Sequence, residues 1–339
     1  MVADGGRDLP HQVSVTLIGC LPQGLDNTAC NAFIQSVPLA AWMPVLSHLQ
    51  QQFGLPDGAW EKIPQGANAL FGLGDEVIVK LVPPNWRRQG DKEMLVAPLL
   101  EGKLSLQTPR LIGGGEIDNW VFVITSRLQG LLLADVWPSL DIEQKRSIMV
   151  QAGQVLRELR AVAFDQDIAI KADWPSYLQD LTAGCLARHQ RRNMPAGLLD
   201  QVLPYIEAAG DFAEAGEPRF IHMDVHPWNL MAKQEEGRWK LDGLLDFGDA
   251  IVGCSDRFEL LTPMIFMAQG SPLLLDALLE SHGGTGGVSA FVLQRQLTAC
   301  MLIRPDSDVM FCMRQVPASG PRDTWDQVAA QMFPFDSTR

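Results

Sequence analysis

The stretch from Arg219 to Asp249 constrains the fold of this chain more than any other part of its sequence. It holds two apolar runs, residues 219–221 and 241–245, which predict short buried strands. Residues 222–229 would form the loop at the end of these strands, and Asp246 would leave the second strand beside that loop. Polar side chains that lie far apart in this stretch are therefore expected to converge.

Three polar side chains of the stretch form a set that suits phosphoryl transfer. Asn229 follows Asp224 at a distance of five residues, and Asp246 opens an Asp-Phe-Gly triplet. One carboxylate offers a base, and the other oxygen atoms are ligands that a hard cation such as Mg²⁺ prefers. A surface loop with two ordinary turn residues is the alternative. The two motifs together, at this spacing, make a chance match remote.

The motifs resemble the catalytic and metal-binding loops of the protein-kinase-like superfamily, specifically its small-molecule branch of aminoglycoside phosphotransferases and choline kinases. The matching positions are His222, Asp224, Asn229, Asp246 and Gly248. The resemblance implies an α+β, bilobal protein-kinase-like fold. Its small lobe would hold a five-stranded antiparallel sheet plus a helix, and its large lobe would be mostly helical. ATP or GTP would be the phosphoryl donor, with Mg²⁺ as cofactor.

The resemblance also implies a role for each matching side chain. Asp224 would be the catalytic base, or would orient the acceptor hydroxyl group, and Asn229 and Asp246 would be the Mg²⁺ ligands. His222 is expected to be structural, tying the loop to the backbone near Phe247.

The small lobe is predicted from alternating apolar runs. Strands are expected at residues 59–64, 68–73, 76–82, 108–113 and 120–125, and helices at 39–53 and 89–102. Lys80 lies in an apolar run that would bury its stem, and it resembles the lysine that anchors ATP. An exposed lysine on an edge strand is the alternative. Glu93 is its expected partner, with Asp91 and Glu101 as other choices.

Further nucleotide contacts follow from the resemblance. The turn at Gly66 would lie over the phosphates, where a residue without Cβ lets backbone N–H groups approach an anion, and Asn68 follows it. The Ser126 carbonyl group and the Leu128 N–H group would contact the base. The implied domains are an N-terminal extension (1–38), a small nucleotide-binding lobe (39–126), a hinge (127–130), and a large helical lobe with the catalytic loop, metal loop and acceptor site (131–339). Apolar spacing predicts helices of the large lobe at 141–163, 174–189, 196–213, 256–267, 271–279, 289–304 and 322–332.

Two departures from protein kinases point to a small-molecule acceptor. Met223 stands where the small-molecule branch usually has Gly and protein kinases usually have Arg. No Ala-Pro-Glu follows the Asp-Phe-Gly triplet, so the peptide-docking segment is missing from the sequence.

The acceptor is expected to be cationic. The net charge of −13 disfavours nucleic acid, whose phosphates would be repelled, and favours a cation. The candidate carboxylates for its ammonium groups are Asp249, Glu259, Asp306 and Asp308. His226 is a candidate substrate contact, with a solvent-exposed loop histidine as the alternative, and Asp256 is expected to cap and brace a helix.

Softer matches, such as Trp42 with Pro44 and Ser126 with Arg127, resemble the hygromycin B phosphotransferases that modify the 7″ hydroxyl group. A metabolic kinase for choline, an amino sugar or homoserine is the alternative. A nucleotide-binding pseudokinase would need the loss of Lys80, Asp224 or Asp246, and all three are present. A monomer or a weak dimer is expected.

The remaining features predict a reduced, cytoplasmic protein. Six scattered cysteines lack Cys-x-x-Cys spacing and predict free thiols rather than a zinc site. No apolar run has the length of a membrane span, and the polar, acidic N-terminus does not resemble a signal peptide.

Overall fold

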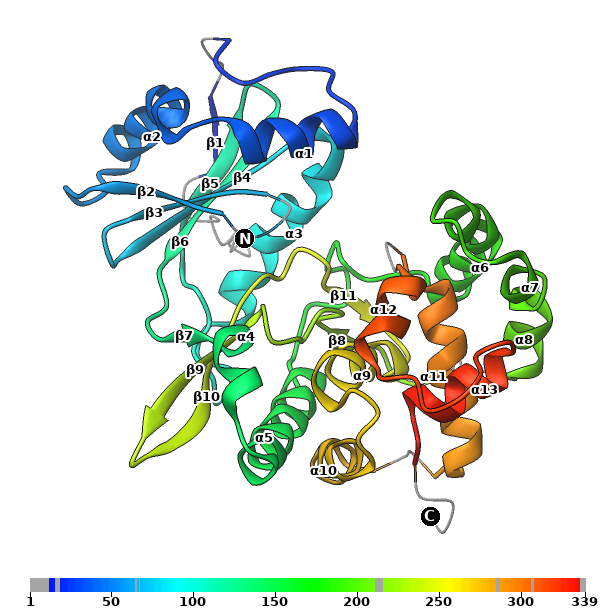
Figure 1. Ribbon diagram of the computed structural model, residues 1–339. Helices are drawn as coiled ribbons and strands as arrows, with labels where there is room; N and C mark the ends of the chain where they lie inside the picture. Colours follow the sequence, from blue (N-terminus) through cyan, green and yellow to red (C-terminus); the bar gives the residue numbers. More distant parts are fainter. Residues whose placement is uncertain are drawn as a thin grey trace, which may run out of the picture. The chain divides into compact units, whose positions relative to one another are not determined.

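The computed structural model (Figure 1) describes residues 12–15, 19–64, 66, 68–210, 216–284, 287–305 and 308–335. The predicted acceptor residue Asp306 lies outside these residues. The chain forms two compact units. We call residues 1–102, 107–129 and 246–248 the small unit, and residues 103–106, 130–245 and 249–339 the large unit. The Asp-Phe-Gly triplet thus belongs to the small unit.

A six-stranded sheet forms the centre of the small unit, in the order β1-β5-β6-β4-β3-β2. Its strands are β1 (Gln12–Val15), β2 (Trp60–Ile63), β3 (Ala69–Leu73), β4 (Val77–Val82), β5 (Leu111–Ile117) and β6 (Trp120–Ser126). Strands β2 to β6 pair antiparallel, which confirms the predicted five-stranded sheet. Strand β1 adds a sixth member, parallel to β5.

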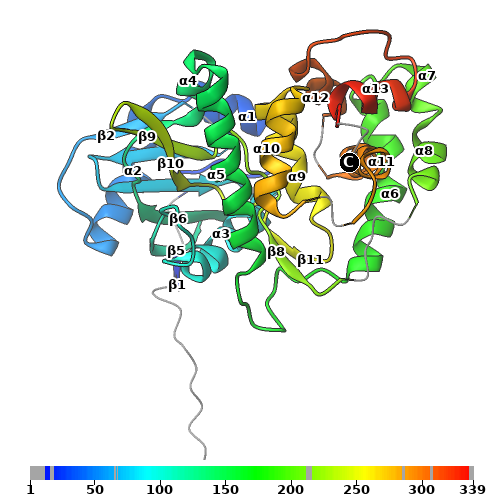
Figure 2. The same ribbon diagram turned by 90° about the horizontal axis from the view of Figure 1, so that it is seen from below.

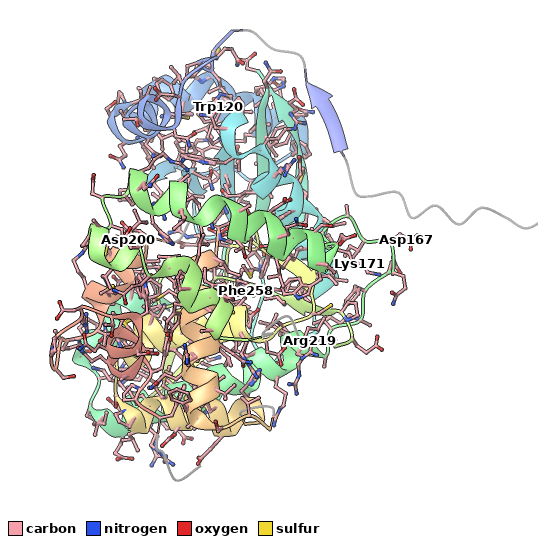
Figure 3. All side chains as sticks on the ribbon, turned by 90° about the vertical axis from the view of Figure 1, so that its right-hand side faces the viewer. Trp120, Asp167, Lys171, Asp200, Arg219 and Phe258 are labelled. Carbon is pink, nitrogen blue, oxygen red and sulfur yellow. The ribbon has the colours of Figure 1, made fainter. Side chains whose placement is uncertain are left out.

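Alternation along β6 explains why this sheet is covered on both faces. Trp120, Phe122 and Ile124 lie in one core cluster, with α1 (Asn27–Ser36) and α2 (Leu39–Phe53), whereas Val121 and Val123 lie in another, against α3 (Arg87–Leu100). Successive side chains of a strand point to opposite faces, so an entirely apolar strand needs a cover on each. Trp120 is fully buried on its face (Figure 3).

The segment predicted as an N-terminal extension contributes to this core. Leu21, Cys30 and Ile34 are buried in the cluster that contains α2. Asp26 caps α1 by accepting a hydrogen bond from the Ala29 backbone N–H group at 2.8 Å. Within the described residues, no single helix has both the length and the hydropathy to cross a membrane; α1 and α2 meet that test only as a pair, which is bent by 92°.

The position predicted for the strand at residues 108–113 is wrong. Strand β5 spans Leu111–Ile117 instead, and its glycines lie inside it. A Cβ atom on Gly114 would lie 2.2 Å from the sulfur atom of Met94. The glycine is therefore needed for close packing of α3 on the sheet, which local sequence does not reveal.

Gly90 of α3 offers a test of this packing. A Cβ atom there would lie 2.6 Å from Cγ1 of Val121, so Gly90→Ala should lower the free energy of unfolding by about 1–3 kcal/mol through overpacking. Urea unfolding measures the change. Gly197→Ala is the matched control because its Cβ atom meets open space in a helix, and it should be neutral or stabilising. Equal stability of the two variants would contradict this account.

The large unit is mostly helical, with two small sheets ordered β10-β9-β7 and β11-β8. Its helices are α4 (Leu133–Val136), α5 (Ile142–Arg160), α6 (Trp174–Arg191), α7 (Ala196–Leu199), α8 (Val202–Ala208), α9 (Arg257–Pro263), α10 (Pro272–His282), α11 (Ala290–Ile303), α12 (Val309–Gln315) and α13 (Trp325–Met332). Its strands are β7 (Leu131–Leu132), β8 (Arg219–Ile221), β9 (Leu230–Glu235), β10 (Arg238–Leu244) and β11 (Ile251–Gly253). Helix α5 packs along α10 (Figure 2).

Two predicted helices of this unit change in detail. The helix predicted at residues 196–213 is split into α7 and α8, and the one predicted at 256–267 is α9 followed by a π-helical turn, η3 (Met264–Ala268). Phe258 of α9 is fully buried (Figure 3). The loop at residues 222–229 runs from β8 to β9, and β9 pairs with β10, so the two strands predicted from the apolar runs do not pair with each other.

Candidate active site

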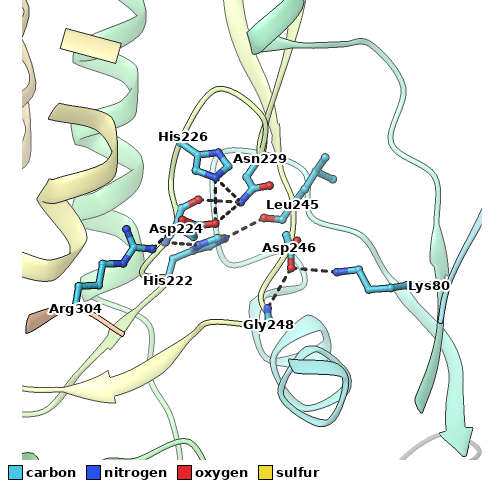
Figure 4. Close-up of polar contacts among 9 residues, drawn as sticks. All are labelled: Lys80, His222, Asp224, His226, Asn229, Leu245, Asp246, Gly248 and Arg304. Atoms are coloured by element: carbon cyan, nitrogen blue, oxygen red, sulfur yellow. Dashed lines mark hydrogen bonds and ion pairs between the residues drawn. The ribbon is translucent and has the colours of Figure 1, made fainter. Parts of the chain in front are cut away.

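Strand alternation directs Lys80 toward α3. Its neighbours Val79 and Leu81 belong to the core cluster on the other face of the sheet, so Lys80 lies on the α3 face. The Lys80 Nζ atom lies 2.6 Å from the Glu93 Oε2 atom and 3.0 Å from the Asp246 Oδ1 atom (Figure 4 draws the second contact). The structure thus brings Lys80, Glu93 and Asp246 together within the small unit.

The charge of Lys80 is secured by these two carboxylates. Burial alone would lower the pKa of Lys80, but the charges of Asp246 and Glu93 outweigh it and raise that pKa above its ordinary value. Asp91, an alternative partner, instead pairs with Arg87 at 3.6 Å. A buried ammonium ion in this position suits the binding of a phosphate group.

Asp246 adopts a left-handed backbone conformation, with φ at +60°. This region is uncommon for residues other than glycine, although Asp tolerates it better than most. The Gly248 backbone N–H group lies 3.4 Å from Asp246 Oδ1, the oxygen that also faces Lys80. A strained backbone that is held in place in this way is typical of functional sites.

Asp224 is the centre of a second polar cluster, which lies in the large unit. Its Oδ1 atom accepts a hydrogen bond from Arg304 Nη2 at 2.9 Å, and its Oδ2 atom lies 3.0 Å from His226 Nε2 and 3.1 Å from Asn229 Nδ2 (Figure 4). Burial alone would raise the pKa of Asp224, but the hydrogen bond from His226 and the charge of Arg304 hold it well below its usual range. Asp224 is therefore a carboxylate at neutral pH.

Asn229 is held by the same loop. Its Nδ2 atom donates to the Asp224 backbone carbonyl at 3.0 Å as well as to Oδ2, so its Oδ1 atom is directed elsewhere. Oxygen donors of Asn and Asp fit Mg²⁺, which binds one or two protein carboxylates together with waters and substrate phosphates. The described residues contain no group of three or more His, Cys, Asp or Glu side chains that would form a complete metal cage. Asn229 and Asp246 each offer an oxygen donor of the kind that Mg²⁺ accepts.

His222 connects the loop at residues 222–229 to the backbone at Leu245. It is fully buried, its Nε2 atom lies 3.0 Å from the Leu245 carbonyl oxygen, and its Nδ1 atom accepts from the Asp224 backbone N–H group at 3.3 Å. One ring nitrogen therefore donates and the other accepts, which fits the structural role expected for His222.

Glu259, predicted as a contact of the acceptor, points into the interior of the large unit. It is buried, and its Oε2 atom accepts hydrogen bonds from the backbone N–H groups of His222 at 2.5 Å and Met223 at 3.4 Å. Met223 has φ at +73°, a strained value for a residue other than glycine, and these two bonds help to hold it. Glu259 is thus a support of the catalytic loop rather than a surface carboxylate, because its oxygen is used inside the unit.

The protonation of Glu259 should make stability depend on pH. Burial raises the pKa of Glu259 to about 8 from an ordinary value of 4.5. Its contribution to stability is full below pH 4.5 and is lost as the pH rises toward 8, at roughly 1.4 kcal/mol for each unit of pKa shift. Glu259→Gln keeps an acceptor oxygen but cannot ionise. Its free energy of unfolding should therefore increase relative to that of the wild type as the pH rises from 5 to 8. Parallel curves for the two proteins in urea unfolding would contradict the shift.

Three further aspartates that were predicted from the sequence have contacts within the large unit. Asp249 lies near Arg304 and contributes to raising the pKa of that guanidinium group. Asp308 caps α12 by accepting from the Phe311 backbone N–H group at 2.9 Å. Asp256 accepts from Arg219 at 2.8 Å and Arg160 at 3.2 Å, so it braces the unit, but its side chain makes no cap bond to α9.

The residues predicted to contact the nucleotide in the small unit have the following conformations and contacts. Gly66 has φ at +95°, which favours glycine, and Asn68 is buried with its Oδ1 atom unbonded among the described residues. The Ser126 hydroxyl oxygen accepts from the Arg110 backbone N–H group at 2.9 Å, and Leu128 is half-buried.

Arg304 was missed by sequence reasoning. It follows the last residue of α11 and pairs with Asp224, which lies 80 residues earlier in the chain. A basic residue at the end of a predicted helix is ordinary, so nothing in the local sequence marks this one.

Comparison with known proteins shows to which family and fold the chain is similar. A model of the phosphotransferase enzyme family matches residues 60–286. Among solved structures, aminoglycoside 2′-phosphotransferase-IIIa in its GDP complex is 16% identical, with a TM-score of 0.65 over 85% of this chain and 98% of that one. The ADP-bound aminoglycoside phosphotransferase APH(2″)-Ib is 19% identical, with a TM-score of 0.56 over 86% and 98% of the two chains. APH(3″)-Id from Streptomyces rimosus, in complex with ADP and streptomycin, is 14% identical, with a TM-score of 0.55 over 77% and 98%. These likenesses confirm the predicted kinase-like α+β fold.

Proposed function

Because this chain belongs to the phosphotransferase enzyme family, we propose that it transfers the γ-phosphoryl group of ATP or GTP to a hydroxyl group of a small cationic acceptor. The observation that carries the proposal is Asp224, a carboxylate kept ionised by Arg304 and His226 at the family's base position. Solved structures of the same fold contain GDP, ADP or ATP, which supports nucleotide binding.

The side chains divide the work as follows. Asp224 accepts the hydrogen bond of the acceptor hydroxyl group, orients it for attack on the γ-phosphorus atom and takes its proton. Lys80, fixed by Glu93, binds the donor phosphates. Asn229 and Asp246 would hold Mg²⁺, which neutralises charge on the phosphate oxygens when bound.

The acceptor class is proposed from two supports. Relatives of the same fold are named as aminoglycoside phosphotransferases, and the net charge of −13 favours a cation. Hygromycin B, through its 7″ hydroxyl group, is the first candidate. Choline, an amino sugar or homoserine would be acceptors under the alternative of a metabolic kinase.

An acceptor panel tests the proposal. The protein is incubated with Mg²⁺, ATP or GTP, and one of hygromycin B, kanamycin, choline or homoserine. We expect an aminoglycoside to gain one phosphoryl group by mass spectrometry, with an equal amount of nucleoside diphosphate released. Transfer to choline or homoserine alone would favour the metabolic kinase, and nucleotide binding without any transfer would favour the pseudokinase.

A further inference from the structure

Three aromatic rings form a continuous surface in the large unit, which we call the aromatic surface: Trp228, Phe266 and Phe311. The centroids of Trp228 and Phe266 lie 5.7 Å apart at an interplanar angle of 81°, and those of Phe266 and Phe311 lie 5.9 Å apart at 40°. Both spacings lie in the range of favourable aromatic contacts. The rings come from the catalytic loop, η3 and α12, so only the tertiary structure joins them.

The aromatic surface is attached to the predicted base through His226. The His226 ring lies 5.4 Å from Trp228 and 5.8 Å from Phe266, edge to face, while its Nε2 atom is 3.0 Å from Asp224 Oδ2. Trp228 also directly precedes Asn229 in the chain. Phe266 lies in a π-helical turn, a feature that is frequent at functional sites. The surface and the carboxylate are thus parts of one contiguous cluster.

Two of these rings are open to solvent. Trp228 is 47% exposed and Phe311 is 41% exposed. Large aromatic side chains on a soluble protein are usually more buried than this, and contiguous exposed apolar groups often mark a ligand site. Ligand pockets are mainly apolar and aromatic, with a few polar groups that direct the ligand. Here Asp224 is such a polar group.

Of the four carboxylates predicted for a cationic acceptor, the three that the structure describes interact with other groups of the chain, and Asp306 lies outside the described residues. Glu259 bonds the loop backbone, Asp308 caps α12, and Asp249 lies beside Arg304. The aromatic surface already receives one cation, since the Arg314 guanidinium group lies 5.9 Å from the centroid of Phe311. Aromatic faces attract ammonium groups and pack against carbon skeletons without a carboxylate.

We propose that the aromatic surface is the acceptor subsite, and that it stacks on a ring of an aminocyclitol or amino sugar whose hydroxyl group faces Asp224. The inference rests on the proposed function, because it concerns the acceptor of that reaction. Recognition is by the ring face rather than by ion pairs. Trp228 determines specificity, and it selects cyclic acceptors over acyclic ones that carry the same charges.

Binding of two matched probes tests the proposal without turnover. 2-Deoxystreptamine carries two ammonium groups on a ring, and 1,3-diamino-2-propanol carries the same pair without a ring. Saturation-transfer NMR titrations on the full chain, free of nucleotide, should give about fivefold tighter binding of the cyclic probe. Trp228→Ala should remove that preference and Trp228→Phe should retain it. Phe291→Ala is the control, because Phe291 is 62% exposed in the same unit but is not part of the aromatic surface.

Salt separates stacking from ion pairing. The ratio of the affinities for the two probes should change little between about 50 and 500 mM salt, over which the Debye length shrinks severalfold, because both probes carry the same charges and lose the same long-range attraction. Equal binding of the two probes, no binding of the cyclic probe, an unchanged Trp228→Ala protein or a loss of the cyclic preference at high salt would each overturn the proposal. Phosphoryl transfer to any panel acceptor with no role for Trp228 would leave the proposed function standing. Binding of the cyclic probe without phosphoryl transfer to any panel acceptor would support the aromatic surface as a binding site but contradict the proposed function.

Discussion

Replacing Asp224 by Asn is expected to lower kcat by about three orders of magnitude while the nucleotide affinity stays nearly unchanged. General-base catalysis contributes roughly 10²- to 10⁴-fold, and the role proposed for Asp224 is on the acceptor rather than on the nucleotide. Asn keeps an oxygen for Arg304, which lies 2.9 Å from Asp224 Oδ1, although its amide nitrogen replaces the oxygen that accepts from His226 and Asn229, so those two side chains must adjust. Steady-state kinetics on the best acceptor, with nucleotide binding by calorimetry, give both quantities.

The Asn variant is preferable to Ala for a physical reason. Asp224→Ala would leave the Arg304 guanidinium group, which is only slightly exposed, without its partner, and a buried charge that loses its partner costs about 3–5 kcal/mol. Asp308→Asn is the matched control, because Asn also caps helices well. We expect it to be nearly silent. A turnover in Asp224→Asn equal to that of the wild type would remove Asp224 from the mechanism.

Replacing Asp246 by Asn is expected to weaken nucleotide affinity in the presence of Mg²⁺ by at least about 10- to 100-fold. Losses of that size follow even when a residue that only orients a metal ligand is replaced. The variant removes one anionic oxygen ligand but keeps the size of the side chain. Asn also tolerates the left-handed backbone at this position, where φ is +60°, better than Ala does. Calorimetric titration of nucleotide at a series of Mg²⁺ concentrations measures the effect.

Glu93→Gln separates loss of the metal ligand from loss of the lysine clamp. It removes the charge that lies 2.6 Å from Lys80 but leaves Asp246 in place. We expect it to weaken nucleotide binding at every Mg²⁺ concentration, whereas Asp246→Asn should act mainly when Mg²⁺ is present. If the Mg²⁺ dependence of Asp246→Asn matched that of the wild type, another residue would have to be the ligand.

Much of the fold could be predicted from the sequence because it depends on local periodicity. The helix at Leu39–Phe53 was predicted to the residue, with Gly54 in the left-handed conformation that ends it. The strands β2, β3 and β4 follow from short apolar runs between turn residues. Burial of Lys80 follows from the same pattern, since its neighbours in β4 are apolar.

The residues of the candidate site could also be found in the sequence. Asp224 and Asn229 lie within one loop, so their spacing along the chain limits their separation in space. Asp246 was placed by its triplet, and the structure adds its contact with Lys80, which lies 166 residues earlier. Chemistry that needs fixed spacing within a loop leaves a motif in the sequence.

Tertiary structure alone decided what surrounds these residues. Arg304 reaches Asp224 from the end of α11, Glu259 turns inward to the loop backbone, and Trp228 meets rings from η3 and α12. The close approach of Met94 to Gly114 of β5 is likewise a contact between distant elements. Such contacts join elements that are distant in the chain, and many different side chains at those positions are compatible with the same local helix or strand. Local sequence therefore determines which elements form and which loop holds the proposed catalytic residues, whereas the packing of distant elements determines the charge, the support and the proposed acceptor surface around them.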